Sequence, residues 1–226
     1  LFALGRAEVT SYGGEVISGQ ATRVQRNEDG KGFAVFLADS SEVRARRLLI
    51  ATGATDELPS IPGLAERWGH DVLHCPFCHG WEARDRAIGI LGTGPMSLHA
   101  TLLWRQISPD VSLFLHTAPP LNPEQAEQLA ALGVRVVEGE VAELVIADDR
   151  LTGVRMRDGE VVPRDILVAA SVVRAHTELL AQLGLHPEPL EMGGQVIATR
   201  IIPGPVGSTD LPGVWVAGNV ADPMGQ

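Results

Sequence analysis

Short apolar runs rich in β-branched residues alternate along the chain with segments of helical periodicity. Glycine, proline and aspartate separate these runs, as expected for strands that are bounded by turns. An alternation of strand and helix patterns predicts an α/β fold with mostly parallel sheets. The predicted strands cover residues 15–18, 33–37, 47–51, 87–91, 111–115, 134–138, 165–169 and 214–217.

Helix start signals locate the helical segments. Pro95 introduces one of them, and Asn122 with Pro123 supplies an N-cap and a favourable first helical residue for another. The start of the chain has the apolar spacing of an amphipathic helix. The predicted helices cover residues 1–9, 96–107, 123–132 and 177–183.

Turn-forming residues also divide the chain at a larger scale. Turn signals at 148–149 and 158–159 predict a β-meander laid over the sheet. Prolines and glycines cluster at 59–63 and again at 203–212. These two clusters suggest crossovers between two domains.

The chain has 226 residues, of which 45% are apolar, and its 18 basic and 28 acidic residues give a net charge of −10. This composition predicts a folded globular protein. The acidic balance offers no basic face for nucleic acid or anionic lipid, and the arginines of 44–47 are interpreted as a solvated edge. Apolar runs such as 166–173 are far shorter than the ~20 residues that span a bilayer. We therefore predict neither nucleic-acid nor membrane binding.

The only two cysteines stand three residues apart in one motif, Cys75-Pro76-Phe77-Cys78-His79-Gly80. With Pro76 at the first position of a helix, both thiols would face the same side of its first turn. There the helix dipole lowers a thiol pKa and permits a reversible disulfide. Because two cysteines in a single motif do not suit a secreted, disulfide-stapled domain, we expect a reducing, cytoplasmic compartment.

Three other interpretations of this motif remain open, although redox chemistry is favoured over them. Cys-x-x-Cys-His is the attachment pattern of c-type haem, but we expect the motif to be buried between α/β elements, with Trp81 in the core. Zinc could bind His74, Cys75, Cys78 and His79, but four ligands within six residues would strain a tetrahedral site. The cysteines could also act as small buried hydrophobic residues.

A glycine-rich motif follows the strand predicted at 87–91. Gly92 and Gly94 form a tight turn that opens a helix, and Ser97 takes the third glycine position of a dinucleotide-binding fingerprint. N–H groups at such a helix start can bind a phosphate, although an ordinary strand-turn-helix has the same pattern. The next strand ends in His116-Thr117, without an acid for the ribose or an arginine for a 2′-phosphate. Each missing charged hydrogen bond costs about 1.5 to 3 kcal/mol, so we expect weak NAD(P)H binding.

Four motifs in order resemble the low-molecular-weight thioredoxin reductases, which are FAD-dependent pyridine nucleotide-disulfide oxidoreductases. They are residues 48–63, the Cys-x-x-Cys, the glycine turn and the segment 209–220. The resemblance implies two Rossmann-like three-layer domains, with an NAD(P)-binding-like domain inserted into an FAD-binding domain. The implied FAD-binding domain comprises 1–65 and 173–226, and the implied insert, which carries the dithiol, comprises 66–172. Because the family's first glycine fingerprint would precede Leu1, we expect a fragment with an incomplete FAD domain.

The resemblance also implies roles for individual residues. Cys78 would lie nearest the flavin, and Cys75 would meet the substrate. Asn219 stands where the family usually has an aspartate that holds the ribityl chain of FAD. The positions that match the family's flavin contacts are Thr52, Gly53, Gly218, Asn219 and Gln226.

His79 points to one branch of this family. Thioredoxin reductases have an aspartate there as general acid and base, whereas Cys-x-x-Cys-His-Gly is similar to flavin-dependent dithiol oxidases, which return electrons to oxygen. Because histidine titrates close to neutral pH, His79 is expected to carry the proton. We therefore predict an FAD-dependent dithiol–disulfide oxidoreductase, expected as a homodimer, that uses Cys75, Cys78 and His79 on a small dithiol or a thioredoxin-like protein.

Two alternatives remain beside this prediction. One is an NAD(P)H-dependent thioredoxin reductase. The other, of a different class, is a non-catalytic nucleotide-binding module or a haem-type electron carrier. No residue is assigned as a metal ligand.

Overall fold

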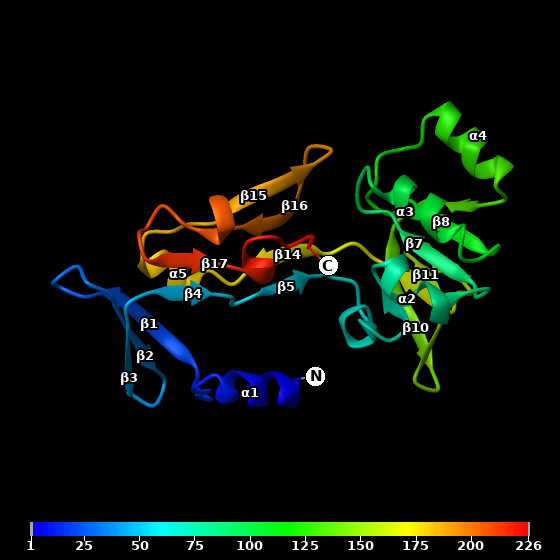
Figure 1. Ribbon diagram of the computed structural model, residues 1–226. Helices are drawn as coiled ribbons and strands as arrows, with labels where there is room; N and C mark the ends of the chain where they lie inside the picture. The colour runs from blue at the N-terminus through cyan, green and yellow to red at the C-terminus, as the bar shows by residue number, and fades with distance from the viewer. Residues whose placement is uncertain (1, 226) are drawn as a thin grey trace. The chain divides into compact units, whose positions relative to one another are not determined.

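The computed structural model describes residues 2–225, which divide into two compact units (Figure 1). Of these residues, unit 1 contains 2–55, 175–189 and 199–225, and unit 2 contains 56–174 and 190–198. The chain passes from unit 1 to unit 2 within strand β5 (Ala54–Glu57) and returns within β14 (Val172–Ala175). The proline- and glycine-rich segment 203–212 lies entirely in unit 1 and marks no crossover.

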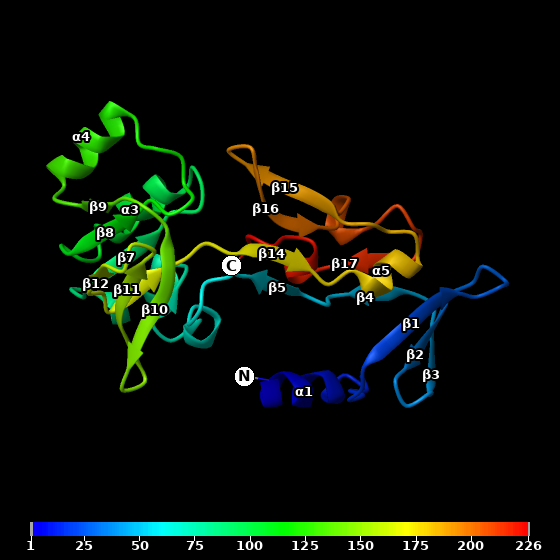
Figure 2. The ribbon, with the colours of Figure 1, turned by 180° about the vertical axis from the view of Figure 1, so that it is seen from behind.

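Unit 2 is built on a five-stranded parallel sheet with the order β6-β13-β7-β8-β9. Figure 2 labels β7, β8 and β9 of this sheet. Its central strands β13, β7 and β8 are short and buried at every position, because both faces of the sheet are covered there. The strand bounds are β6 (Val72–Leu73), β7 (Ile88–Leu91), β8 (Val111–Phe114), β9 (Arg135–Val137) and β13 (Ile166–Val168).

Two hydrophobic cores cover the opposite faces of this sheet. Because successive strand residues point to opposite faces, Ile88 and Ile90 pack in the core that contains the helices, whereas Leu91 packs in the core that contains the meander. A Cβ on Gly89 would lie 2.7 Å from the Phe114 ring, so the sheet requires glycine there. Unit 2 is thus a three-layer, Rossmann-like α/β domain, as predicted. The helices are α2 (Pro76–Ala83), α3 (Ser97–Trp104) and α4 (Pro123–Ala131), and the meander consists of β10 (Val141–Ala147), β11 (Arg150–Met156) and β12 (Val161–Val162).

Unit 1 combines an antiparallel sheet, β1-β2-β3, with a parallel pair, β4 and β17. Phe33, Ile50, Leu180, Val214 and Val216 pack together in its core.

The strands β15 and β16 form a sheet with β14 and β5 in the order β15-β16-β14-β5. The remaining bounds are α1 (Phe2–Ser11), α5 (Glu178–Gln182), β1 (Ala21–Arg26), β2 (Phe33–Leu37), β3 (Glu42–Ala45), β4 (Leu48–Ile50), β15 (Glu188–Met192), β16 (Gln195–Arg200), β17 (Val214–Val216), η1 (Ala65–Arg67, in unit 2), η2 (Pro205–Gly207) and η3 (Gly218–Val220).

Several elements differ from the sequence predictions. Residues 15–18 form no strand, because their side chains are exposed and no neighbouring strand pairs with them in the described chain. The helix predicted at 96–107 ends at Trp104 and continues as a turn. Helix α1 is present, but none of its described residues is buried, so its apolar side chains have no packing partner there. Within the described residues, no helix combines the length and apolar composition needed to cross a membrane.

Candidate functional site

The dithiol motif lies in unit 2, between the end of β6 and the start of α2. Cys75 is the N-cap residue of α2, and Pro76 occupies the first helical position, where its missing N–H costs nothing. Cys78 therefore lies in the first turn, with its side chain hydrogen-bonded to that of Cys75. The backbone N–H of His79 closes the turn by donating to the Cys75 carbonyl oxygen at 3.2 Å. Cys75 is half-buried and Cys78 is exposed.

The pKa of Cys78 depends on its neighbour Cys75. The hydrogen bond with Cys75 raises the pKa of Cys78, and partial desolvation and the charge on Cys75 raise it further. This direction is opposite to the one expected from the helix dipole alone, because the neighbouring sulfur dominates. At a given pH, Cys78 therefore carries less thiolate than an isolated cysteine would.

The surroundings of the motif are more open than expected. Phe77 is 81% exposed and Trp81 is 74% exposed, so the expectation of a buried motif with Trp81 in the core is wrong. The Arg84 guanidinium stacks on the Trp81 ring at 3.9 Å, a cation–π contact at the surface of α2. These aromatic side chains face outward because the buried face of α2 is formed by Gly80 and Ala83.

His79 combines an accessible position with a buried ring nitrogen. The residue is half-buried, and its Nδ1 atom is buried without a hydrogen-bond partner among the described residues. The half-buried imidazole directly follows the exposed Cys78, so it lies beside the thiol that a substrate can reach. His74, by contrast, is exposed and places its Nδ1 atom 3.2 Å from the Ala169 carbonyl oxygen. Among the described residues, no three His, Cys, Asp or Glu side chains are arranged to hold a metal ion.

The glycine turn connects β7 to α3 in the same unit. A Cβ on Gly92 would lie 2.6 Å from the carbonyl oxygens of Phe114 and Leu115, so strand β8 passes too close for any other residue. The hydroxyl oxygen of Ser97 accepts hydrogen bonds from the N–H groups of Thr93 (3.2 Å) and Gly94 (3.3 Å). These N–H groups belong to the turn that would face a pyrophosphate in a dinucleotide-binding domain.

A second side chain lies against the same turn. Gln195, at the start of β16 and also in unit 2, donates from Nε2 to the Thr93 carbonyl oxygen at 3.4 Å. A Cβ on Gly94 would overlap the Gln195 Oε1 atom at 1.9 Å. Sequence reasoning did not identify Gln195, because it lies about a hundred residues from the turn. Ser97 and Gln195 thus occupy part of the turn that a pyrophosphate would contact in a dinucleotide-binding domain.

The end of β8 is also poorly suited to a 2′-phosphate. Burial lowers the pKa of His116, and its Nδ1 atom accepts a hydrogen bond from the Val141 N–H at 3.1 Å, so its ring is neutral. The structure brings a charged pair near His116 that the sequence did not reveal, Arg157 with Glu140 at 2.9 Å. Because Glu140 neutralises Arg157, this pair adds no net positive charge at the end of the strand.

The candidate flavin contacts lie in unit 1, beyond the carboxyl ends of β4 and β17. These strands are parallel neighbours, so Thr52 and Gly53 after one strand lie at the same edge as Gly218 and Asn219 after the other. Ligands of open α/β sheets bind at this edge. Gly53 (φ +74°) and Gly218 (φ +71°) leave open space where a side chain would stand, as a closely approaching cofactor requires. The residues fit FAD; Gln226 lies outside the described residues.

His176 supports this edge and was not identified from the sequence. Its Nδ1 atom lies 2.9 Å from the Thr52 carbonyl oxygen and its Nε2 atom lies 2.6 Å from the Thr55 hydroxyl. Because a carbonyl oxygen only accepts, Nδ1 donates to Thr52, while Nε2 and the Thr55 hydroxyl share the second hydrogen bond. The Thr52 hydroxyl in turn donates to the His176 carbonyl oxygen at 2.6 Å, and the His176 N–H donates to Gly53. Four hydrogen bonds thus hold the turn that carries Thr52 and Gly53.

A comparison with protein families agrees with this combination of a dithiol turn, a glycine turn and a nucleotide-binding edge. The family model described as pyridine nucleotide-disulphide oxidoreductase matches residues 5–226. The chain belongs to this family. Within the family it is similar to thioredoxin reductases, as the four motifs suggested, and its fold agrees with two-domain Rossmann-like oxidoreductases.

Two curated relatives illustrate the likeness. The thioredoxin reductase tcpT of Claviceps purpurea is 28% identical over 226 residues, which cover 96% of this chain and 68% of that protein. The thioredoxin reductase aclD of Aspergillus oryzae is 28% identical over 187 residues, which cover 78% of this chain and 56% of that protein. This member of the oxidoreductase family therefore spans about half to two thirds of the length of these relatives.

Several solved structures are also similar to this chain. HlmI is 40% identical, with a TM-score of 0.83 over 99% of this chain and 68% of that chain. An oxidoreductase from Agrobacterium tumefaciens is 29% identical, with a TM-score of 0.86 over 99% of this chain and 72% of that chain. A putative thioredoxin reductase, TrxB, from Bacillus anthracis is 22% identical and shares the fold, with a TM-score of 0.85.

Proposed function

We propose that this member of the pyridine nucleotide-disulphide oxidoreductase family is an FAD-dependent dithiol–disulfide oxidoreductase that oxidises a small dithiol. The observation that carries the proposal is the pairing of Cys75 and Cys78 in the first turn of α2, with the unpartnered Nδ1 atom of His79 one residue further on. In this proposal the parts of unit 1 that surround Thr52 and Gly218 bind FAD, and unit 2 carries the dithiol.

The proposed reaction begins from a Cys75–Cys78 disulfide. A substrate thiolate attacks the Cys75 sulfur, the Cys75–Cys78 bond breaks, and Cys78 leaves as a thiolate. The second substrate thiol then attacks the substrate sulfur that is bonded to Cys75, which closes the substrate disulfide and expels the Cys75 thiolate. The substrate loses two electrons and two protons, and the cysteine pair gains the two electrons.

The chain's own residues support these steps. The His79 imidazole accepts the proton of the attacking thiol in this proposal. Thr52, Gly53, Gly218 and Asn219 would hold the cofactor. When bound, FAD would take the electron pair from the reduced cysteines and pass it to an acceptor such as oxygen.

An NAD(P)H-dependent thioredoxin reductase is the second candidate function, because the curated relatives are named thioredoxin reductases. The two candidates differ in the electron donor of the flavin. In the first candidate the donor is the substrate dithiol, through the cysteine pair, and in the second it is NAD(P)H. The engagement of the Thr93 and Gly94 N–H groups by Ser97 favours the first candidate, since a pyrophosphate would have to displace that hydroxyl. A cytoplasmic location, expected from the cysteine usage, and a homodimer, implied by the family resemblance, belong to the proposal as well.

Anaerobic stopped-flow spectroscopy of the FAD-loaded, full-length protein tests the proposal. We expect a small dithiol to bleach the flavin band at least tenfold faster than NADPH at equal concentration, because each charged hydrogen bond that NADPH lacks removes about one to two decades of affinity. A Ser97→Gly variant frees the two turn N–H groups. It should reduce the difference between the rates of flavin reduction by the dithiol and by NADPH. Reduction by NADPH as fast as by the dithiol in the parent protein would favour the reductase instead.

A further inference from the structure

A basic hollow lies within unit 1. It encloses about 740 Å³, which falls inside the range of about 300 to 1,000 Å³ that is typical of small-molecule sites. Its lining includes four cationic side chains, although the whole chain has a net charge of −10. The four are Arg26, Lys31, Arg46 and Arg47. Positive charge is therefore concentrated here against the overall charge of the protein.

The positive charge of the hollow is not neutralised by the protein. Of the ion pairs among the described residues, none involves these four side chains. The Arg26 guanidinium donates only to the Gly30 carbonyl oxygen, at 3.3 Å. Asp29 in the same loop uses its carboxylate to accept the Lys31 N–H at 2.8 Å and does not line the hollow. An anion would thus meet donors that have no competing carboxylate.

The hollow lies at the opposite end of the strands from the candidate flavin contacts. Arg46 and Arg47 directly precede β4, and Gly213, which also lines the hollow, directly precedes β17. The Leu48 N–H donates to the Gly213 carbonyl oxygen at 2.8 Å and joins these two segments. Thr52, which follows β4, is five residues from Arg47, a separation of roughly 15 Å along an extended strand. The hollow is therefore a second site at the amino edge, separate from the carboxyl edge where dinucleotides bind.

The walls suggest the chemistry of a ligand. Arginine guanidinium groups bind phosphate oxygens through paired N–H donors, and three arginines with one lysine suit a ligand that carries more than one phosphate charge. The half-buried Trp215 ring also lines the hollow, with the Arg47 guanidinium 6.0 Å from its centre. A flat ring beside cations offers a stacking surface for an aromatic base.

We propose that this hollow binds a small phosphorylated molecule of the nucleoside diphosphate class. Its phosphates would lie among Arg46, Arg47 and Lys31, and its base would lie against Trp215. The proposal goes beyond the dithiol chemistry and does not depend on it, since no residue of the hollow belongs to the thiol, glycine-turn or flavin sites.

Isothermal titration calorimetry on the FAD-loaded, full-length protein tests this proposal, with ADP and inorganic pyrophosphate as separate probes. Loading with FAD removes the cofactor site as a competing place for ADP. We expect both probes to bind in 150 mM salt, and the double variant Arg46→Gln/Arg47→Gln to weaken both at least tenfold. Trp215→Leu should weaken ADP at least threefold more than pyrophosphate, because only ADP has a base.

Arg44→Gln is the matched control. Arg44 belongs to the same basic run but is exposed, pairs with Glu42 at 2.7 Å and does not line the hollow, so its loss should leave both affinities within twofold. If the double variant does not fold, as judged by its circular dichroism, Arg26→Gln/Lys31→Gln removes the charges from the loop side. Absence of binding, or equal weakening by Arg44→Gln, would overturn the proposal, as would ADP binding that every variant leaves unchanged. Binding that tightens with the length of a single-stranded nucleic acid would assign the surface to a polymer and overturn it too.

Discussion

At the scale of single residues, proton chemistry distinguishes His79 from the other histidines near the dithiol. The ring of His79 keeps a buried nitrogen without a partner, whereas His74 lies at the surface beside a carbonyl oxygen. The sequence could indicate the role of His79 because the residue directly follows Cys78. It could not indicate the burial of one ring nitrogen, because burial depends on how α2 packs.

We predict that His79→Ala slows dithiol turnover by about 10²- to 10⁴-fold, as the loss of a general base does. His79→Asp should recover part of the rate, since a carboxylate can accept the same proton once burial raises its pKa. Steady-state turnover from pH 5 to pH 9 measures both effects, and flavin content should stay that of the parent. A His79→Ala rate within a few-fold of the parent would show that another group carries the proton.

His176 is predicted to position the flavin edge without touching the reacting atoms. Removing its two ring hydrogen bonds with His176→Leu should weaken FAD binding by roughly tenfold or more, at about 1 kcal/mol for each bond. Fluorescence titration of the apoprotein with FAD measures this affinity directly. His186→Leu, at an exposed histidine, serves as the control and should change the affinity less than twofold. Equal affinities in the two variants would contradict the positioning role.

At the scale of secondary structure elements, the sequence could predict those whose apolar side chains all find partners. Strand β7 and helix α4 were predictable, because β7 is buried on both faces and α4 starts with a capping box in which Asn122 and Gln125 bond reciprocally. Strand β1 was missed, because Val24 is its only buried residue and its polar side chains hide the alternation. The strand predicted at 15–18 was wrong, because apolar residues alone do not form a strand without a pairing partner.

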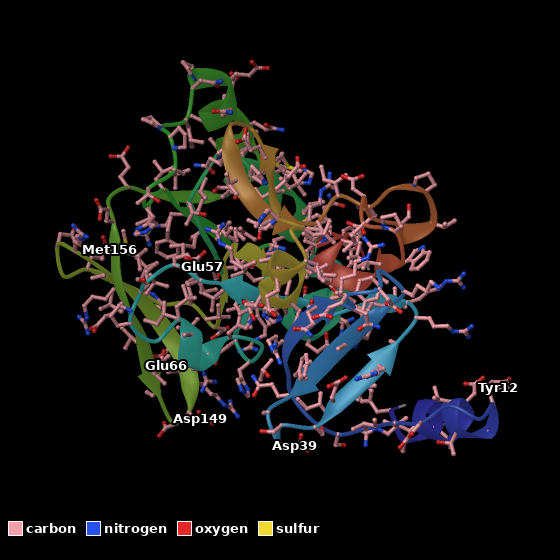
Figure 3. All side chains as sticks on the ribbon, turned by 90° about the vertical axis from the view of Figure 1, so that its left-hand side faces the viewer. Tyr12, Asp39, Glu57, Glu66, Asp149 and Met156 are labelled. Carbon is pink, nitrogen blue, oxygen red and sulfur yellow. The ribbon has the colours of Figure 1, made fainter. Side chains whose placement is uncertain are left out.

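An ion-pair cluster joins η1, the start of β6 and the meander. The Asp71 carboxylate accepts from Arg67 at 2.8 and 2.7 Å and from the Leu151 N–H at 2.9 Å. Arg67 also pairs with Asp149. Asp149 lies at the turn of the β10–β11 hairpin (Figure 3). Burial acts to raise the pKa of Asp71, but the bonds from Arg67 and Leu151 outweigh it and hold the pKa below its usual value of 3.8. The cluster therefore depends on an ionised Asp71.

The lowered pKa of Asp71 determines how pH affects the stability of the fold. A carboxyl group with a lowered folded-state pKa stabilises the fold above about pH 4 and loses that contribution as the pH falls through the folded-state pKa. We predict that Asp71→Asn lowers the free energy of unfolding at pH 7 by about 3 kcal/mol, because Arg67 loses its main buried partner. The variant should also lose less stability than the parent between pH 5 and pH 2.

Urea denaturation at several pH values measures both effects. Asp148→Asn is the matched control, because Asp148 is exposed and makes no hydrogen bond through its carboxylate in the described structure. Its urea midpoint should follow that of the parent at every pH. An Asp71→Asn midpoint equal to that of Asp148→Asn at pH 7 would show that the cluster does not stabilise the fold.

At the scale of the whole molecule, the chain divides its chemistry between two units. The order of the four motifs was enough to predict the family and the α/β fold, since these depend on sequence patterns that extend over nearly the whole chain. The boundaries predicted from the sequence are 65/66 and 172/173, whereas the chain passes between the two compact units after Thr55 and after Arg174. The assignment of residues 190–198 to unit 2 could not be predicted, because it depends on contacts distant in sequence, such as that between Gln195 and Thr93.

The central claim is that the electron pair passes between the flavin and the Cys75–Cys78 dithiol, with Cys78 nearest the flavin. The most direct measurement is the visible spectrum of FAD-loaded, full-length Cys75→Ser and Cys78→Ser proteins, titrated from pH 6 to pH 10. We predict that Cys75→Ser, which retains the Cys78 thiolate, shows a long-wavelength charge-transfer band that grows with pH, and that Cys78→Ser shows none. A band in Cys78→Ser alone would reverse the two roles, and the absence of a band in both variants would contradict the claim.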